Sequence, residues 1–293
     1  MNKGYIYKKV DAFTGNSSKG NPAAYMILGD ERFTNKQFLD IASAHKGFIC
    51  EFVFVQNSDI ADLKLTYYSS ECEVDFCGHG TIATMYELIK DDPKLFAKER
   101  IQIETNKKGI LTVYNHVKDE DAIYISAPKA KVYDVNVEPN EVATALGTTV
   151  DVISQEFPMA VIDAGLKTLI VPISSLQDEI TILPDIDVLK EFVVNSDIDI
   201  ILIFSKETSE ASYYAHTRVF SPKFGYLEDP ATGSGNSAFA YYLLMNNYWK
   251  GKPIAVEQGN KNMIYNTVRL RAENDEILFG GTATVKISGM YYT

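Results

Sequence analysis

The sequence predicts an α+β protein of two pseudo-symmetric lobes, each a β-sheet or barrel wrapped around a central helix. Segments of alternating or β-branched residues recur in both halves of the chain, as expected for strands. Two helical runs, 82–89 and 238–245, are apolar on nearly every face, and such a helix must be buried. The length of 293 residues exceeds the usual size of a single core and favours two domains.

The first half of the chain reads as a strand-rich lobe with one early surface helix. Thr34 and Gln37 have the spacing of a capping box, so we expect a helix that starts there and ends near Gly47. The strand pattern covers seven segments, 5–13, 23–28, 51–56, 63–69, 100–105, 110–115 and 122–126.

The second half repeats the same kinds of element. Pro139 and Gly147 bracket a helix expected at 138–146. Strands are expected at 160–163, 168–172, 199–205, 213–220, 254–258, 267–272, 276–279 and 283–287. Segment 127–134 lacks periodicity, which indicates lobes at 1–127 and 128–281; a strand at 282–293 could return to complete the first lobe.

Composition limits the partners of the chain. Its 28 basic and 39 acidic residues give a formal charge of −11, which disfavours nucleic acid and anionic membranes. Three cysteines without framework spacing fit a reducing compartment. The first residues show no secretory pattern, and the most apolar run, 198–204, is far shorter than a membrane span. We therefore expect a cytoplasmic protein with a small-molecule partner.

Two glycine-rich turns, 75–81 and 228–236, lead into the two apolar helical runs. A helix start leaves backbone N–H groups unpaired and carries partial positive charge, so it attracts anions. Glycines allow close approach of a ligand, and nearby hydroxyls can either cap the turn or contact that ligand. Ordinary capping explains either turn alone, whereas the pair indicates a ligand site. The residues in question are Gly78, Gly80, Thr81, Thr232, Gly233 and Ser234.

Several motifs along the chain resemble those of the phenazine-biosynthesis PhzF-like family. They are 10–13 with 20–24, Glu51, 77–81, 218–222 and 229–234, of which the last is the most specific. The resemblance implies the diaminopimelate epimerase-like fold, an active site between the lobes and a homodimer. It also implies a cofactor-independent isomerase that moves a proton on a small unsaturated or cyclic acid.

The same resemblance assigns the catalytic acid/base to Glu51 and further site roles to His79, Asp229 and Ser234. Burial of Glu51 in an apolar crevice should raise its pKa toward the working pH. The predicted helix start beside His79 should favour its neutral form. Asp229 could cap its turn, orient His79 or hold a substrate amine. Ile49, Cys50 and Gly80 replace residues that are commoner in the family.

Two other functions stay open beside the isomerase. A protein with this fold could bind a partner without turnover, since fold does not fix function. An amino-acid epimerase of the two-thiol kind would use Cys77, but the second turn contains no cysteine. Cys77 otherwise reads as a packing residue. The four histidines lie far apart and show no zinc spacing, so we expect neither a metal nor a cofactor.

Overall fold

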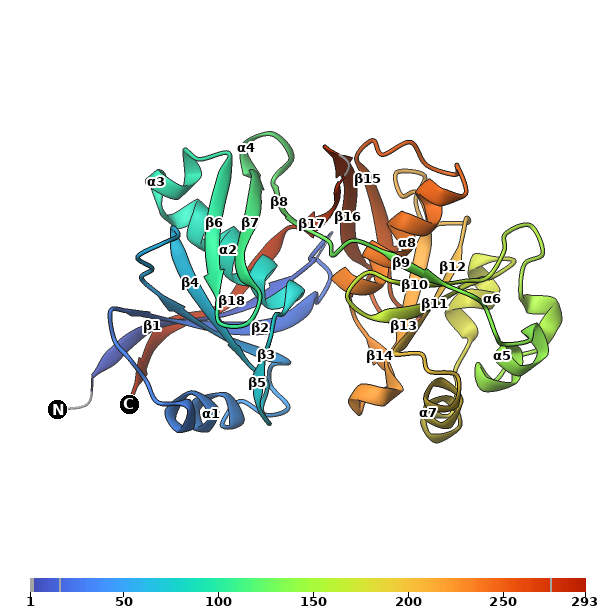
Figure 1. Cartoon of the computed structure of the whole chain (residues 1–293), viewed down its shortest axis with the longest axis horizontal. Helices are drawn as coiled ribbons and strands as arrows, with labels where there is room; N and C mark the ends of the chain where they lie inside the picture. The colour runs from blue at the N-terminus through green and yellow to red at the C-terminus, as the bar shows by residue number, and fades with distance from the viewer. Residues whose placement is uncertain (1–2, 16, 275) are drawn as a thin grey trace. The chain divides into compact units, whose positions relative to one another are not determined.

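The chain forms two compact units in a computed structural model that describes residues 3–15, 17–274 and 276–293. Unit 1 comprises Met1–Ser126 and Gly280–Thr293, and unit 2 comprises Ala127–Phe279. Both units contain helices and strands (Figure 1), which confirms the predicted α+β class.

Unit 1 is a mixed sheet with one long interior helix. Its strands are β1 (Gly4–Ala12), β2 (Asn21–Gly29), β3 (Glu51–Gln56), β4 (Leu63–Tyr68), β5 (Glu73–Val74), β6 (Arg100–Thr105), β7 (Gly109–His116), β8 (Ala122–Ser126) and β18 (Ala283–Tyr292). Its helices are α1 (Asn35–Ser43), α2 (Gly78–Asp91), α3 (Pro93–Phe96) and α4 (Val117–Glu120).

The strands of unit 1 pair in the order β18, β1, β2, β3, β4, β6, β7, β8. Pairs β2–β3 and β4–β6 are parallel, and the others in this series are antiparallel. Helix α1 lies in the connection between the first parallel pair, and α2 lies in the connection between the second. Such crossovers are what parallel neighbours require.

Unit 2 is built from the same kinds of element. Its strands are β9 (Lys131–Tyr133), β10 (Ala160–Asp163), β11 (Lys167–Pro172), β12 (Ile200–Ser205), β13 (His216–Phe220), β14 (Glu228–Asp229), β15 (Ile254–Gln258), β16 (Asn266–Glu273) and β17 (Glu276–Gly281), the last of which ends in unit 1. Its helices are α5 (Pro139–Ala145), α6 (Leu176–Thr181), α7 (Ile186–Asn195) and α8 (Gly233–Met245), with 3-10 turns η1 (Val150–Val152) and η2 (Pro222–Phe224).

The strand connections of unit 2 repeat those of unit 1. The pairs β11–β12 and β13–β15 are parallel, and α6 with α7 connects the first pair while α8 connects the second. In both units a two-residue strand, β5 or β14, pairs antiparallel with the preceding strand just before the interior helix. The weak two-fold echo in the sequence therefore corresponds to a repeated topology.

Each sheet separates two cores. In unit 1, Phe52 and Phe54 of β3 pack with Phe38 of α1, while α2 contacts the opposite face. In unit 2, Ile201 and Ile203 of β12 pack in a cluster with residues of α5 and α7. Phe204, which alternates with them, instead contacts Phe239 and Tyr242 of α8. Helices α2 and α8 thus occupy the interior, as their apolar sequences predict (Figure 1).

Several boundaries differ from the sequence-based expectation. Helix α2 begins at Gly78 and α8 at Gly233, so both glycine turns contribute their last residues to the helix itself. The strand expected at 213–220 begins at His216, and the strand expected at 283–287 continues to Tyr292. Helix α1 ends at Ser43, a few residues before Gly47. Helices α6 and α7 were not predicted.

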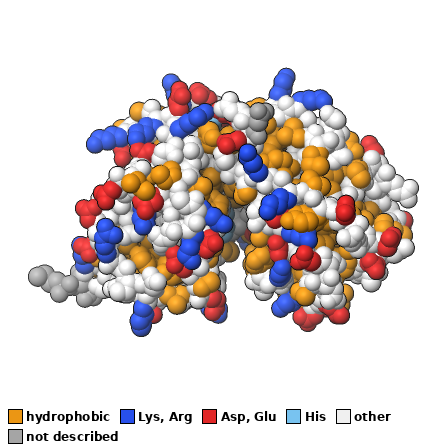
Figure 2. Space-filling model, viewed as in Figure 1, with side chains coloured by type: hydrophobic (Ala, Val, Ile, Leu, Met, Phe, Trp, Pro, Cys, Tyr) orange, Lys and Arg blue, Asp and Glu red, His pale blue; other side chains and the backbone are white. Residues whose placement is uncertain are grey.

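The surface in Figure 2 carries mixed charge. Lys and Arg side chains lie among Asp and Glu over the visible face of each unit, without a large patch of one sign. Among the described residues, no helix combines the length and the apolar character that a membrane crossing requires.

Candidate active site

Glu51 is the first residue of β3, and the alternation of that strand directs its side chain. Phe52 and Phe54 belong to the core cluster beside α1, so Glu51 and Val53 point to the other face. The start of α2 lies on this face, since a Cβ atom added to Gly80 would lie 3.1 Å from Val53 Cγ2. Glu51 is therefore on the side of the sheet that faces the first turn of α2.

The carboxyl of Glu51 is buried and lacks a full set of partners. Its side chain is 7% exposed, and Oε1 has no hydrogen-bond partner among the described residues. Burial raises the pKa of Glu51 to about 8, because an ionised carboxylate loses its hydration there. This is the direction expected from the sequence. At pH 7 the carboxyl consequently holds its proton in most molecules, and it can still release it.

Cys77 caps helix α2 with its side chain. Its Sγ accepts a hydrogen bond from the backbone N–H of Gly80 at 3.3 Å and lies 3.2 Å from His79 Nδ1. Cys77 is thus more than the packing residue that the sequence suggested. Thr81, which was expected to cap or contact a ligand, lies inside the helix and donates to the Cys77 carbonyl at 2.8 Å.

His79 is held in its neutral form. The ring is part-buried at the second residue of α2, and burial lowers its pKa to about 4. The neutral state agrees with the expectation, but the cause is desolvation, whereas the sequence argument invoked the helix start. A neutral imidazole offers one donor and one acceptor nitrogen.

The glycines of the first turn leave room for this arrangement. Gly78 is the first residue of α2, and Gly80 is fully buried against β3. A Cβ atom at Gly80 would lie 3.2 Å from Cys77 Sγ as well as close to Val53. Gly80 therefore allows the cap and the strand to approach each other.

Unit 2 presents a second helix start with a different hydrogen-bond arrangement. Thr232 is the N-cap of α8 but makes no side-chain cap bond; its hydroxyl donates to Asp229 Oδ2 at 2.6 Å. Gln258 of β15 donates to the Asp229 carbonyl at 2.8 Å and accepts from the Thr232 N–H at 3.1 Å. The cap expected of the Thr232 hydroxyl is therefore absent, and the hydroxyl instead orients the Asp229 carboxylate.

Gly233 and Ser234 are the first two residues of α8. A Cβ atom at Gly233 would come within 2.4 Å of the Phe279 ring, so only glycine fits there without movement. Ser234 is partly exposed, and no side-chain cap bond involves it. The first turn of α8 therefore combines tight backbone packing with an accessible hydroxyl.

A buried ion pair fixes the segment that carries Asp229. Arg218 is 1% exposed and donates to both carboxylate oxygens of Glu228, at 2.9 and 3.0 Å. It also donates to the backbone carbonyls of Glu179 and Ile182. Such a bidentate pair sets direction as well as distance. The two partners lie in separate sequence motifs, 218–222 and 228–236, whose spacing did not indicate the pairing.

The structure thus groups the predicted residues within each unit. In unit 1, Cys77 and His79 contact each other at the start of α2, on the sheet face toward which Glu51 points. In unit 2, Thr232 contacts Asp229, and Ser234 follows in the first turn of α8. Within the described ranges, no group of three or more His, Cys, Asp or Glu residues is arranged to hold a metal ion.

Comparison with known proteins identifies the family of the chain. The family model "Phenazine biosynthesis-like protein" matches residues 10–289. The chain belongs to this family. The predicted resemblance to PhzF-like proteins is therefore confirmed.

Individual members of the phenazine biosynthesis-like family match along nearly the whole chain. The uncharacterized isomerase YfhB of Bacillus subtilis is 30% identical over 284 residues, which cover 96% of this chain and 94% of the relative. A crystal structure of a PhzF-family protein from Bacillus anthracis has a TM-score of 0.85 at 26% identity and covers 99% of both chains. A PhzF-family structure from Enterococcus faecalis has a TM-score of 0.79 at 24% identity, covering 99% of this chain and 100% of that one.

Family membership also gives the class of reaction. Several relatives across the full length are named as isomerases, and the protein is an isomerase of this family. The predicted fold class agrees with the same structural relatives.

Proposed function

We propose that the protein isomerises a small unsaturated or cyclic acid by moving a proton between carbon atoms, with Glu51 as general acid/base and without a cofactor. The observation that supports this proposal is the buried Glu51 carboxyl, whose Oε1 finds no hydrogen-bond partner among the residues that the structure describes and whose pKa is raised to about 8. A group that titrates near the working pH can both take and return a proton.

The proposed reaction needs only one proton carrier. The ionised Glu51 carboxylate removes a proton from a carbon next to the unsaturated system, and the electron pair of that C–H bond delocalises into the system. The carboxylic acid then returns the proton to a second carbon, which restores the carboxylate. No atom is gained or lost, and proton transfer of this kind contributes about a hundred- to ten-thousand-fold in rate.

The surrounding groups suit a delocalised anion. Neutral His79 can donate one hydrogen bond without adding a charge of its own. The backbone N–H groups at the start of α2, including Gly78, carry partial positive charge. Fixed donors of this type stabilise charge that develops in a transition state.

We propose substrate-binding roles for the start of α8. Asp229 carries a carboxylate that the Thr232 hydroxyl orients, and a carboxylate suits contact with a substrate hydroxyl or amine. Ser234 supplies an accessible hydroxyl, and Gly233 supplies backbone at the first position of the helix. An anionic substrate group suits such a helix start.

Hydrogen exchange in D₂O tests the proposal. The protein is incubated with a panel of small unsaturated, hydroxy and amino acids, and deuterium incorporation is followed by NMR. We expect exchange with at least one unsaturated or cyclic acid, retained in Cys77→Ser and abolished in Glu51→Gln. Exchange that survives Glu51→Gln contradicts the assignment of the proton carrier.

Two-thiol epimerisation is disfavoured by a comparison of the two helix starts. Cys77 is the N-cap of α2, and the residue in the same position of α8 is Thr232. A hydroxyl with an ordinary pKa does not replace a thiol as a proton donor and acceptor near neutral pH. The binding protein without turnover that the sequence left open is set aside, because the full-length relatives are named as isomerases.

We further propose that the protein is a cytoplasmic homodimer. The cysteines support the reducing compartment, since exposed Cys50 and Cys72 and buried Cys77 form no disulfide within the described part of the chain. The dimer rests on the family resemblance. Sedimentation equilibrium tests it, and a mass of one chain at micromolar concentration contradicts it.

A further inference from the structure

Tyr67 lies on the same face of the sheet as Glu51. It sits in β4 opposite Val53 of β3, and paired residues of antiparallel strands point to the same side. Tyr67 is 1% exposed, and burial raises its pKa well above the ordinary value; charge on Cys77 and Glu51 acts in the same direction, and the hydrogen bond to Thr81 opposes it. The phenol consequently keeps its proton at every pH at which the enzyme works.

The direction of its hydrogen bond follows from counting protons. Tyr67 Oη lies 2.7 Å from Thr81 Oγ1, and the Thr81 hydroxyl donates to the Cys77 carbonyl at 2.8 Å. A hydroxyl has a single proton, so Thr81 cannot also donate to Tyr67. Tyr67 is therefore the donor, and the two bonds form a directed chain from β4 to the carbonyl of the helix cap.

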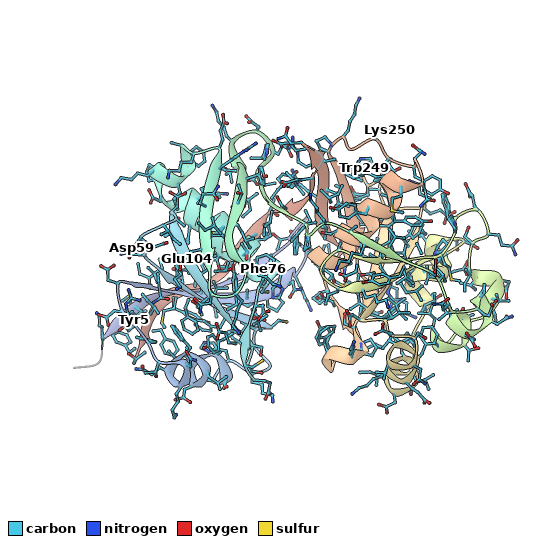
Figure 3. The ribbon with its side chains drawn as sticks, in the orientation of Figure 1. Tyr5, Asp59, Phe76, Glu104, Trp249 and Lys250 are labelled. Atoms are coloured by element: carbon cyan, nitrogen blue, oxygen red, sulfur yellow. The ribbon has the colours of Figure 1, made fainter. Side chains whose placement is uncertain are left out.

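The ring of Tyr67 holds the same turn by packing. Its edge meets the Phe76 ring with centroids 5.8 Å apart and an interplanar angle of 74°. Figure 3 marks Phe76 just ahead of α2 in unit 1. The Tyr67 ring thus contacts Phe76, which precedes the Cys77 cap, and the Tyr67 hydroxyl contacts Thr81, which follows the cap.

We propose that Tyr67, acting through Thr81, is the positioning residue that sets the geometry of the first turn of α2 beside Glu51; this inference rests on the proposed function of Glu51. The two hydrogen bonds from Tyr67 through Thr81 fix the Cys77 carbonyl. They thereby orient Cys77, whose Sγ contacts His79 and the Gly80 N–H. Without the phenol hydroxyl, the Thr81 oxygen no longer accepts a hydrogen bond from Tyr67, and the first turn of α2 loses this hydrogen-bonded connection to β4.

The test compares two neighbouring tyrosines of one strand. Tyr67→Phe removes only the hydroxyl and keeps the ring against Phe76, whereas Tyr68→Phe makes the same change on the opposite face, in the cluster beside α1. For Tyr67→Phe we expect kcat to fall about tenfold to a hundredfold with KM little changed, because small misplacements in a site have effects of this size. Tyr68→Phe should leave both constants as in the wild type.

A second measurement does not depend on activity. Nitrogen-15 NMR of the His79 ring reports its tautomer and pKa, which is about 4 in the wild type. We expect Tyr67→Phe to raise the His79 pKa toward its ordinary value as the turn loosens and the ring gains water, and Tyr68→Phe to leave it unchanged. Unchanged His79 signals in Tyr67→Phe overturn the proposal, whether or not a substrate for the enzyme has been found.

Substitutions at Thr81 separate positioning from a general loss of folding. Thr81→Ser keeps the hydroxyl and should retain wild-type His79 signals and kcat, while Thr81→Val should reproduce Tyr67→Phe. The double variant Tyr67→Phe/Thr81→Val should be no worse than either single one, since both break one chain. Additive losses, or losses that follow the melting temperature in all variants, refute the proposal. If Tyr67→Phe and Thr81→Val change the His79 signals as expected but no acid in the panel shows deuterium exchange, only the proposed function of Glu51 is refuted.

Discussion

Replacing Glu51 by glutamine should make the protein more stable while it removes activity. The folded state holds the Glu51 proton up to about pH 8, whereas an unfolded chain releases it near the ordinary pKa of 4.5. Each unit of pKa corresponds to about 1.4 kcal/mol, so the difference amounts to at most about 5 kcal/mol. Glutamine has nearly the same shape and never ionises, so it avoids this cost.

The sign of the pH dependence follows from proton counting. Below pH 4.5 both states hold the proton, and Glu51 does not alter stability as pH changes. Between pH 4.5 and about 8 only the folded state holds it, so wild-type stability falls by about 1.4 kcal/mol for each pH unit. Above pH 8 both states have lost the Glu51 proton, and the difference in stability between Glu51→Gln and the wild type stays constant. The advantage of Glu51→Gln should therefore be small at pH 4.5 and largest above pH 8.

Urea unfolding followed by far-ultraviolet circular dichroism, at pH 5 and pH 8.5, measures this difference. Glu99→Gln is the matched control, because the Glu99 side chain is exposed in the same unit. The single tryptophan, Trp249 (Figure 3), lies in unit 2. Its fluorescence therefore reports the unfolding of unit 2 and distinguishes it from the unfolding of unit 1, which contains Glu51. An advantage of Glu51→Gln that is equal at the two pH values refutes the buried, protonated carboxyl.

Three further predictions concern rate, packing and the thiol. The value of kcat/KM should rise with pH through a limb near 8, because the carboxylate is the base in the free enzyme; a limb near pH 4.5 contradicts this. Gly233→Ala should lower the free energy of unfolding by about 1 to 3 kcal/mol, since its Cβ meets the Phe279 ring at 2.4 Å. Thermal unfolding measures this loss, and the control Gly289→Ala, with open space around it, should melt as the wild type does. Cys77→Ser should keep the cap of α2 and the exchange of deuterium into substrate; loss of exchange with an intact fold would make the thiol a proton carrier.

Local signals in the sequence were sufficient for much of the fold. The Thr34 and Gln37 capping box forms as predicted, because it depends on residues three positions apart. The interior position of α2 and α8 followed from their apolar composition. Helix α7 was missed although Asp185 caps it and Leu189 and Val193 form its buried side, which is a readable pattern.

Other features depend on contacts between segments far apart in the sequence. Strand β18 extends to Tyr292 because it pairs with β1 as far as Gly4; the sequence suggested a strand at 282–293 that returns to the first lobe, but no local pattern named β1 as its partner. The roles of Tyr67 and Gln258 were not predicted for the same reason. Each looks like an ordinary strand residue until its contact with a helix start, at Thr81 or Thr232, is known. By contrast, both the site role of Glu51 and the expectation that it is buried came from the resemblance; β3 buries each of its first five residues, so its burial pattern does not alternate.

Direct titration of the Glu51 carboxyl tests the central claim. Protein labelled with carbon-13 at glutamate Cδ is titrated by NMR from pH 4 to pH 10, and the resonance missing from Glu51→Gln identifies the site. We predict that this resonance moves with a midpoint near pH 8, as a desolvated carboxyl should. A midpoint below pH 5 would show that the carboxyl is hydrated or paired, and the proposed proton carrier would then be wrong.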